Sequence, residues 1–86
     1  MESSSELDYL VEQLERMGMD VRYEKLGGES TGLCKIKGRS VMFVDMDADV
    51  ATRVDRCIRA LATVPDIDVT YLPPTIRERL DKIKNT

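Results

Sequence analysis

Apolar residues recur along this chain at two different spacings, and the changes of spacing divide it into helices and strands. Residues 5–17 and 50–63 have apolar positions three or four residues apart, which is typical of helices that bury one face. Pro65 ends the second of these helices, because proline cannot continue a helix. A last helix is predicted after the capping box formed by Thr75 and Glu78.

Three other segments show the alternation or the unbroken apolar character of strands: 20–26, 33–37 and 40–45. Residues 41–44 are all apolar, which favours a central strand with both faces covered. Gly38-Arg39 is the predicted two-residue hairpin turn between the second and third strands. Residues 67–71 alternate as well and predict an optional short fourth strand.

The predicted order of elements is therefore α-β-β-β-α-(β)-α. We expect an α+β fold of two layers, with three helices packed on a three- to four-stranded, mainly antiparallel sheet. A chain of 86 residues forms one domain, 1–86. Within it, residues 1–4 are expected to be disordered. Residues 27–32 contain three glycines and are expected to form a flexible loop.

The composition argues against several kinds of chemistry. Histidine is absent, so Ser-His-Asp catalysis, histidine-ligated zinc and an imidazole pH switch are excluded. The two cysteines, Cys34 and Cys57, form no CxxC motif and are expected to pack in the core as small apolar residues. A net charge of −3 disfavours nucleic acid as a general partner. No cofactor is predicted, and the sequence favours a protein that is not an enzyme.

The location is predicted from what the sequence lacks. The first residues have neither the positive charge nor the apolar segment of a secretory signal. No apolar run approaches the ~18 residues that would span a bilayer. We therefore expect a cytoplasmic protein that makes no membrane contact, with both thiols reduced.

Three aspartates stand at alternate positions where the third strand runs into the second long helix: Asp45, Asp47 and Asp49. Such carboxylates are candidate ligands for Mg²⁺, which prefers hard oxygen donors. The alternative is that Asp47 or Asp49 caps the following helix. In the order of a calcium-binding EF-hand loop, Val50 stands where glycine is needed and Arg56 where a bidentate carboxylate is needed, so that type of site is excluded.

Asp45 and Asp47, at the end of an apolar strand, resemble the first motif of haloacid-dehalogenase-like phosphatases. In that family the first aspartate is a nucleophile and the second an acid. The sequence departs from the family at Ala48-Asp49, where Gly-Thr or a similar pair would follow. The family also needs a much larger sheet and a distant lysine, so the resemblance does not extend to its activity.

Two segments, 32–38 and 72–80, resemble short uncharacterised bacterial proteins. This resemblance implies a free-standing bacterial protein and transfers no activity. The hairpin followed by a helix is also similar to the start of small zinc metallopeptidases, in which that helix bears His-Glu-x-x-His. Here residues 54–59 read Val-Asp-Arg-Cys-Ile-Arg, so neither zinc nor its activated water is expected.

The leading hypothesis is a non-enzymatic interaction or accessory module with an unknown protein partner. One alternative is a protein that binds a divalent metal or phosphate through Asp45, Asp47 and Asp49. Another is a weak nucleic-acid binder that uses a basic face. The residues of this basic face would be Lys35, Lys37, Arg39, Arg53, Arg56 and Arg59.

The strand at 41–44 has apolar residues on both of its faces, whereas helices packed on one side would cover only one. An exposed apolar face of this kind is unusual in a monomer. Either the last helix, with Ile76, Leu80 and Ile83, covers the second face, or a second copy of the chain does. The narrow stripe of that helix leads us to expect a homodimer.

Overall fold

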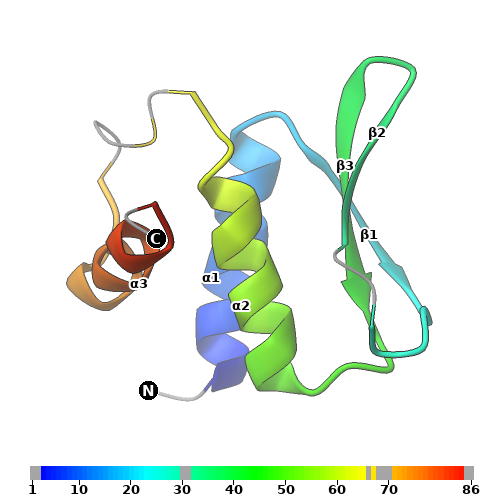
Figure 1. Ribbon diagram of the computed structural model, residues 1–86, viewed down its shortest axis with the longest axis horizontal. Coiled ribbons are helices and arrows are strands. Elements are labelled where there is room, and N and C mark those ends of the chain that lie inside the picture. The colour runs from blue at the N-terminus through cyan, green and yellow to red at the C-terminus, as the bar shows by residue number, and fades with distance from the viewer. Residues whose placement is uncertain (1–2, 30–31, 66, 68–70, 85–86) are drawn as a thin grey trace.

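The fold is a three-stranded sheet with helices on one side of it (Figure 1). The structure is a computed structural model and describes residues 3–29, 32–65, 67 and 71–84. Its elements in chain order are α1 (Ser3–Arg16), β1 (Asp20–Glu24), β2 (Leu33–Ile36), β3 (Arg39–Asp45), α2 (Val50–Leu61) and α3 (Pro74–Lys84). The predicted α+β class is confirmed. Among the described residues, no helix is both long enough and apolar enough to cross a membrane.

The sheet has the strand order β1-β3-β2 and is mixed. β2 and β3 form the expected antiparallel hairpin, but β1 runs parallel to β3, so the prediction of a mainly antiparallel sheet is wrong. The physical reason lies in β3, whose continuous apolar run favours the central position. The chain leaving β1 therefore passes to the far edge of the sheet before it returns as β3. Most of the predicted fourth strand, residues 67–71, lies outside the described residues.

The hairpin turn is one residue earlier than predicted. Ile36 pairs with Arg39, so the two turn residues are Lys37 and Gly38. Both have positive φ, 53° and 79°, as the type I′ turn requires. Glycine therefore occupies the second central position of the turn, and Lys37 adopts a left-handed conformation at the first.

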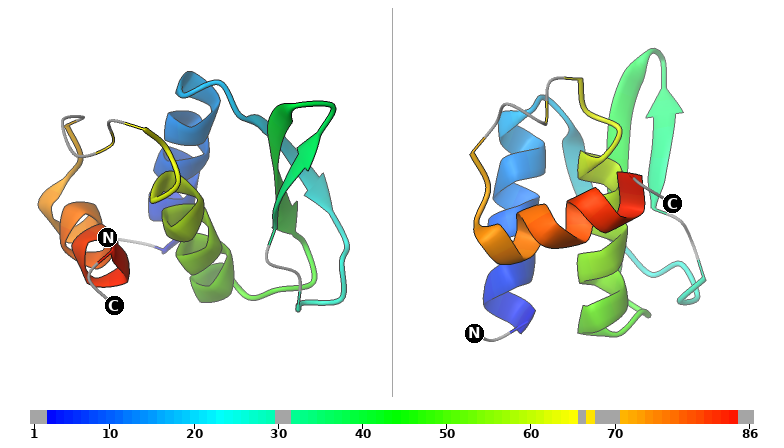
Figure 2. Two further views of the ribbon diagram at one scale, coloured as in Figure 1. Left: turned by 45° about the horizontal axis from the view of Figure 1, so that its top comes forward. Right: turned by 60° about the vertical axis from the view of Figure 1, so that its left-hand side comes forward.

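α1 and α2 lie side by side against one face of the sheet, and α3 crosses their outer side (Figures 1 and 2). The molecule therefore has three layers, where the sequence predicted two. Arg79 of α3 contacts Glu6 of α1 at 3.4 Å across the outer interface. The fully buried aliphatic side chains lie mainly between the sheet and the helices: Leu10, Leu14, Met42, Val44, Val54, Ile58, Leu61 and Leu80. Removal of this apolar surface from water is the main stabilising contribution.

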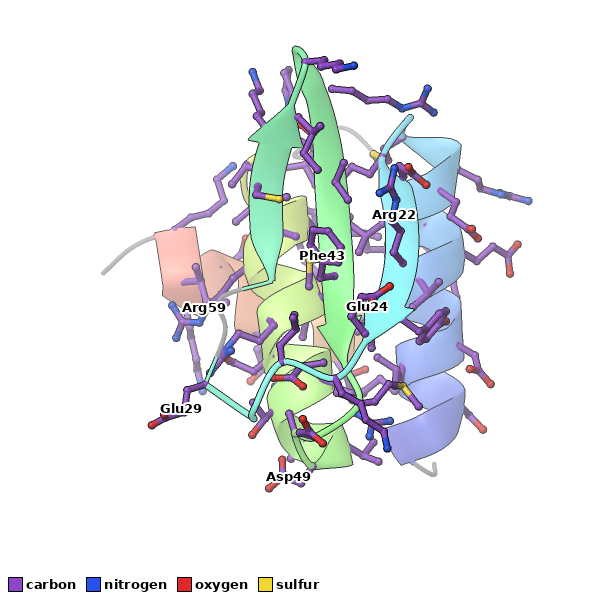
Figure 3. All side chains as sticks on the ribbon, turned by 90° about the vertical axis from the view of Figure 1, so that its right-hand side faces the viewer. Arg22, Glu24, Glu29, Phe43, Asp49 and Arg59 are labelled. Carbon is purple, nitrogen blue, oxygen red and sulfur yellow. The ribbon has the colours of Figure 1, made fainter. Side chains whose placement is uncertain are left out.

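Among the described residues, no helix lies in front of the second face of the sheet (Figure 3). Because α3 packs on the other helices, it does not provide the cover that was one of the two alternatives. We call this surface the open face. It includes Phe43, which is half-buried, and Ile36, which is 40% exposed. Val41 also belongs to this face but is buried between its register partners on β1 and β2.

Candidate functional site

Asp45, the last residue of β3, anchors the loop that follows β1. Its Oδ1 accepts hydrogen bonds from the backbone N–H groups of Leu26 and Asp47, both at 2.9 Å. Its Oδ2 accepts from the N–H of Gly28 at 2.8 Å. Burial opposes ionisation of this carboxyl, but the three N–H donors and the positive charge of Arg56 together lower the pKa of Asp45 below its ordinary value. Asp45 therefore functions as a structural acceptor.

The other two aspartates are also bonded to backbone N–H groups. Asp47 Oδ2 accepts from the N–H of Gly27 at 2.8 Å. Asp49 is the N-cap of α2, and its Oδ1 accepts from the N–H of Thr52 at 2.7 Å. Hydrogen bonds from Thr52 lower the pKa of Asp49. The capping interpretation of Asp49 is confirmed, whereas Asp47 binds the glycine loop.

Two glycines and one arginine complete this structure. Gly27 and Gly28 have φ values of 83° and 84°, a conformation that lets consecutive N–H groups reach the two carboxylates. From α2, Arg53 Nε donates to the carbonyl oxygens of Asp45 and Ala48 at 3.0 Å each, and its Nη2 donates to Met46 O at 3.0 Å. We call the set of Gly27, Gly28, Asp45, Asp47 and Arg53 the aspartate–glycine junction.

The predicted metal site coincides with this junction and the cap next to it. Asp45, Asp47 and Asp49 each accept hydrogen bonds from different backbone groups. In the ranges that the structure describes, no three or more histidine, cysteine, aspartate or glutamate side chains converge as metal ligands. Metal binding by these three residues stays a prediction, and the observed geometry supports their structural role.

An open groove lies between Leu33 of β2 and the helix α2. Its volume is about 530 Å³, and we call it the β2–α2 groove. Its lining residues are Leu33, Arg56, Arg59, Ala60 and Thr63. The sequence offered a signal for it, since both arginines belong to the predicted basic face. The sequence did not show that Arg53, a third member of the predicted basic face, belongs to the junction and does not line the groove.

The two arginines of the groove differ in how their charges are compensated. Arg59 Nε donates to Asp55 Oδ2 at 2.9 Å, in an ion pair on the exposed surface. Arg56 Nη1 is buried and, among the described residues, has no hydrogen-bond partner. Asp45 lies near enough for its pKa to respond to Arg56, yet its oxygens are bonded to backbone N–H groups. The groove therefore contains a guanidinium group whose hydrogen bonds are incomplete.

No family model, curated protein or solved structure matches this chain.

The two cysteines have different environments. Cys57 is fully buried on α2, as expected, and burial raises the pKa of its thiol to about 11. A thiol with that pKa is a poor nucleophile at neutral pH. Cys34 is exposed, so its predicted core position is wrong. It pairs with Val41 in β3 and thus belongs to the open face.

Proposed function

We propose that this protein is a non-enzymatic interaction module that binds an acidic segment of a partner protein in the β2–α2 groove. The proposal rests on Arg56, which lines the groove together with Arg59 and whose buried Nη1 has no hydrogen-bond partner among the described residues. An unsatisfied buried donor costs roughly 1–3 kcal/mol. A carboxylate is well suited to guanidinium groups, because it can accept two of their N–H bonds at once.

The second arginine of the groove supports the same partner chemistry. The ion pair of Arg59 with Asp55 is exposed, and pairs of this i, i+4 type contribute only about 0.3–0.5 kcal/mol. Arg59 can therefore exchange Asp55 for a carboxylate of the partner at small cost. Lys35, on the strand that borders the groove, adds further positive charge. The groove is thus locally basic on a chain of net charge −3.

Nuclear magnetic resonance titration of the ¹⁵N-labelled protein separates this proposal from the two alternatives. A short poly-glutamate peptide is expected to shift the signals of Leu33, Arg56 and Arg59, with an effect that decreases with salt. The double variant Arg56→Gln/Arg59→Gln should abolish the shifts. The control variant Arg16→Gln, on α1, should leave them intact. Absence of shifts with the peptide at millimolar concentration would contradict the proposal.

The same titration tests the other functions. A DNA oligonucleotide that shifts the groove signals at lower concentration than the peptide would assign the basic face to nucleic acid. Shifts at Asp45, Asp47 and Asp49 with millimolar MgCl₂ would support the metal site. If DNA or Mg²⁺ binds and the peptide does not, the corresponding alternative function replaces the proposed interaction module.

A homodimer through the open face is a separate proposal. Ile36 and Phe43 expose apolar surface there, and Cys34 lies next to them on β2. The neighbouring strand β1 presents Arg22 and Glu24 (Figure 3), whose opposite charges can match each other across a two-fold axis. Sedimentation at tens of micromolar is expected to show a dimer that Phe43→Glu disrupts. A monomer of 9.8 kDa at that concentration would contradict this proposal.

A further inference from the structure

We infer that the acidic segment binds as an additional β-strand along the outer edge of β2, an inference that rests on the proposed function. β2 is an edge strand in the order β1-β3-β2. In an antiparallel pair, the backbone N–H and C=O groups of one residue bond to the partner strand, and those of the next residue point away from it. The bond from Phe43 N–H to Gly32 O, at 2.7 Å, fixes which residues point inward.

The backbone of Gly32 bonds to β3, so by this alternation the backbone groups of Cys34 and Ile36 also point toward β3. The N–H and C=O groups of Leu33 and Lys35 consequently point to the outer edge. These are two donors and two acceptors at the spacing that a further strand would use. Recognition by strand addition takes its affinity from such backbone groups and its selectivity from alternate side chains.

The groove lies where alternate side chains of the added strand would reach. Leu33 pairs with Met42 on the helix side of the sheet, and it lines the groove together with Arg56 and Arg59. A strand next to β2 lies about 4.8 Å from it, and every second side chain points to the helix side. Those side chains meet the two arginines, so carboxylates are expected at alternate positions of the partner segment.

Charge also decides against a second copy of β2 as the occupant. Two β2 edges paired about a two-fold axis would bring Lys35 of one copy close to Lys35 of the other. Like charges across a strand pair are destabilising. An acidic strand gains attraction from the same lysine. Lys35 therefore disfavours self-pairing at this edge and favours the acidic partner.

The probe for this inference is a labelled peptide of about ten residues in which valine and glutamate alternate. Its comparison is a peptide of the same composition with the valines and glutamates in two blocks. Fluorescence anisotropy at low salt should show the alternating peptide binding about tenfold more tightly, since only that peptide can place all its carboxylates on one side. An alternating valine–lysine peptide should not bind.

The backbone of β2 is tested with two substitutions at one position. Lys35→Pro removes an outward N–H without removing a bond to β3, and Lys35→Gln removes only the charge. Affinity for the alternating peptide should fall about tenfold in Lys35→Pro and about twofold to threefold in Lys35→Gln. If Lys35→Pro fails to fold, hydrogen exchange answers the same question in the unaltered chain. Peptide binding should then slow exchange at Leu33 and Lys35 and leave Cys34 unchanged.

The possible results separate this inference from the proposed function. Equal binding of the two acidic peptides, with equal effects of both Lys35 substitutions, would overturn strand addition and leave the acidic groove in place. Failure of both acidic peptides to bind would overturn both proposals. Assembly of the protein without peptide, prevented by Lys35→Pro, would assign the β2 edge to a second copy and overturn the inference.

Discussion

The aspartate–glycine junction and the β2–α2 groove both place charged side chains next to α2, but they differ in how completely these side chains are hydrogen-bonded within the described residues. In the junction, Asp45 accepts three backbone N–H groups and Arg53 donates to three carbonyl oxygens. In the groove, Arg59 pairs with Asp55 on the exposed surface, whereas the buried Nη1 of Arg56 has no partner among the described residues. The acidic motif is therefore bonded within the fold, and the groove is the site of the recognition that we propose.

The energetic consequences of the two regions are opposite. Charge-assisted hydrogen bonds of the junction stabilise the folded state. A buried guanidinium nitrogen without a hydrogen-bond partner destabilises it. Proteins commonly retain such local costs at functional positions. Substitutions in the two regions should therefore change stability in opposite directions, which makes the comparison testable.

The largest effect is expected for Gly32→Ala, where the loop that begins at the junction enters β2. An added Cβ would lie 2.8 Å from Phe43 O and 2.9 Å from Met42 Cε, and the φ of 87° disfavours a side chain. We expect a loss of about 3 kcal/mol in the free energy of unfolding, measured with urea. Gly18→Ala is the matched control, because its φ is 91° but nothing lies within 4 Å of the added Cβ. It should lose about 1–2 kcal/mol from backbone strain alone. Equal losses would show that the approach to Phe43 is unimportant.

The next effect concerns the acceptors of the junction. Asp45→Asn keeps the shape of the side chain but replaces one acceptor oxygen by a donor that faces the N–H groups. Asp47→Asn is the matched control, because Asp47 is exposed and, within the described residues, accepts only from Gly27. The urea midpoint should fall clearly in Asp45→Asn and only slightly in Asp47→Asn. A larger loss in the control would show that Asp45 is not the anchor of the loop.

The pH dependence of stability follows from the same residues. The folded-state pKa values of Asp45 and Asp49 lie below their unfolded values, so both stabilise the fold above the unfolded pKa of about 4. This contribution is lost as pH falls through the folded pKa values. Urea midpoints should therefore decrease below about pH 4, and less steeply in Asp45→Asn. An unchanged slope in that variant would show that the carboxylate is not linked to folding.

The sequence predicted most elements of the fold because helix stripes and strand alternation are local patterns. It did not predict the parallel pairing of β1 with β3, because strand order depends on which strand occupies the centre. The three aspartates are close together in the sequence, so their shared place between β3 and α2 could be predicted. The sequence could not show that Leu26, Gly27 and Gly28 donate to them from a loop about 20 residues earlier. The sequence did predict Arg56 and Arg59 as part of a basic face, but it could not show the groove between them and Leu33 of β2.

In the groove, removal of the arginine charge should leave the fold intact or strengthen it. Arg56→Met keeps the long side chain and removes the unsatisfied N–H, so the free energy of unfolding should stay equal or rise by up to about 1 kcal/mol. Affinity for the alternating acidic peptide should fall about tenfold in the same variant. Stability measured with urea and affinity measured by anisotropy thus change independently. Marked destabilisation would mean that the charge of Arg56 is needed inside the fold, where it lowers the pKa of Asp45.

The smallest effect is expected from modification of Cys34, which lies on β2 but points away from the groove. Its register partner Val41 belongs to the open face, whereas Leu33 pairs with Met42 on the helix side. Iodoacetamide at neutral pH should modify Cys34 alone, because Cys57 is buried and its thiol pKa is raised to about 11. Mass spectrometry counts the modified thiols, and anisotropy then measures the peptide affinity. That affinity should change by less than about twofold if the groove side of β2 is the binding surface. A large loss of peptide affinity would show that the peptide binds at the open face. Because the modified thiol lies on that face, the same sample also tests the proposed dimer.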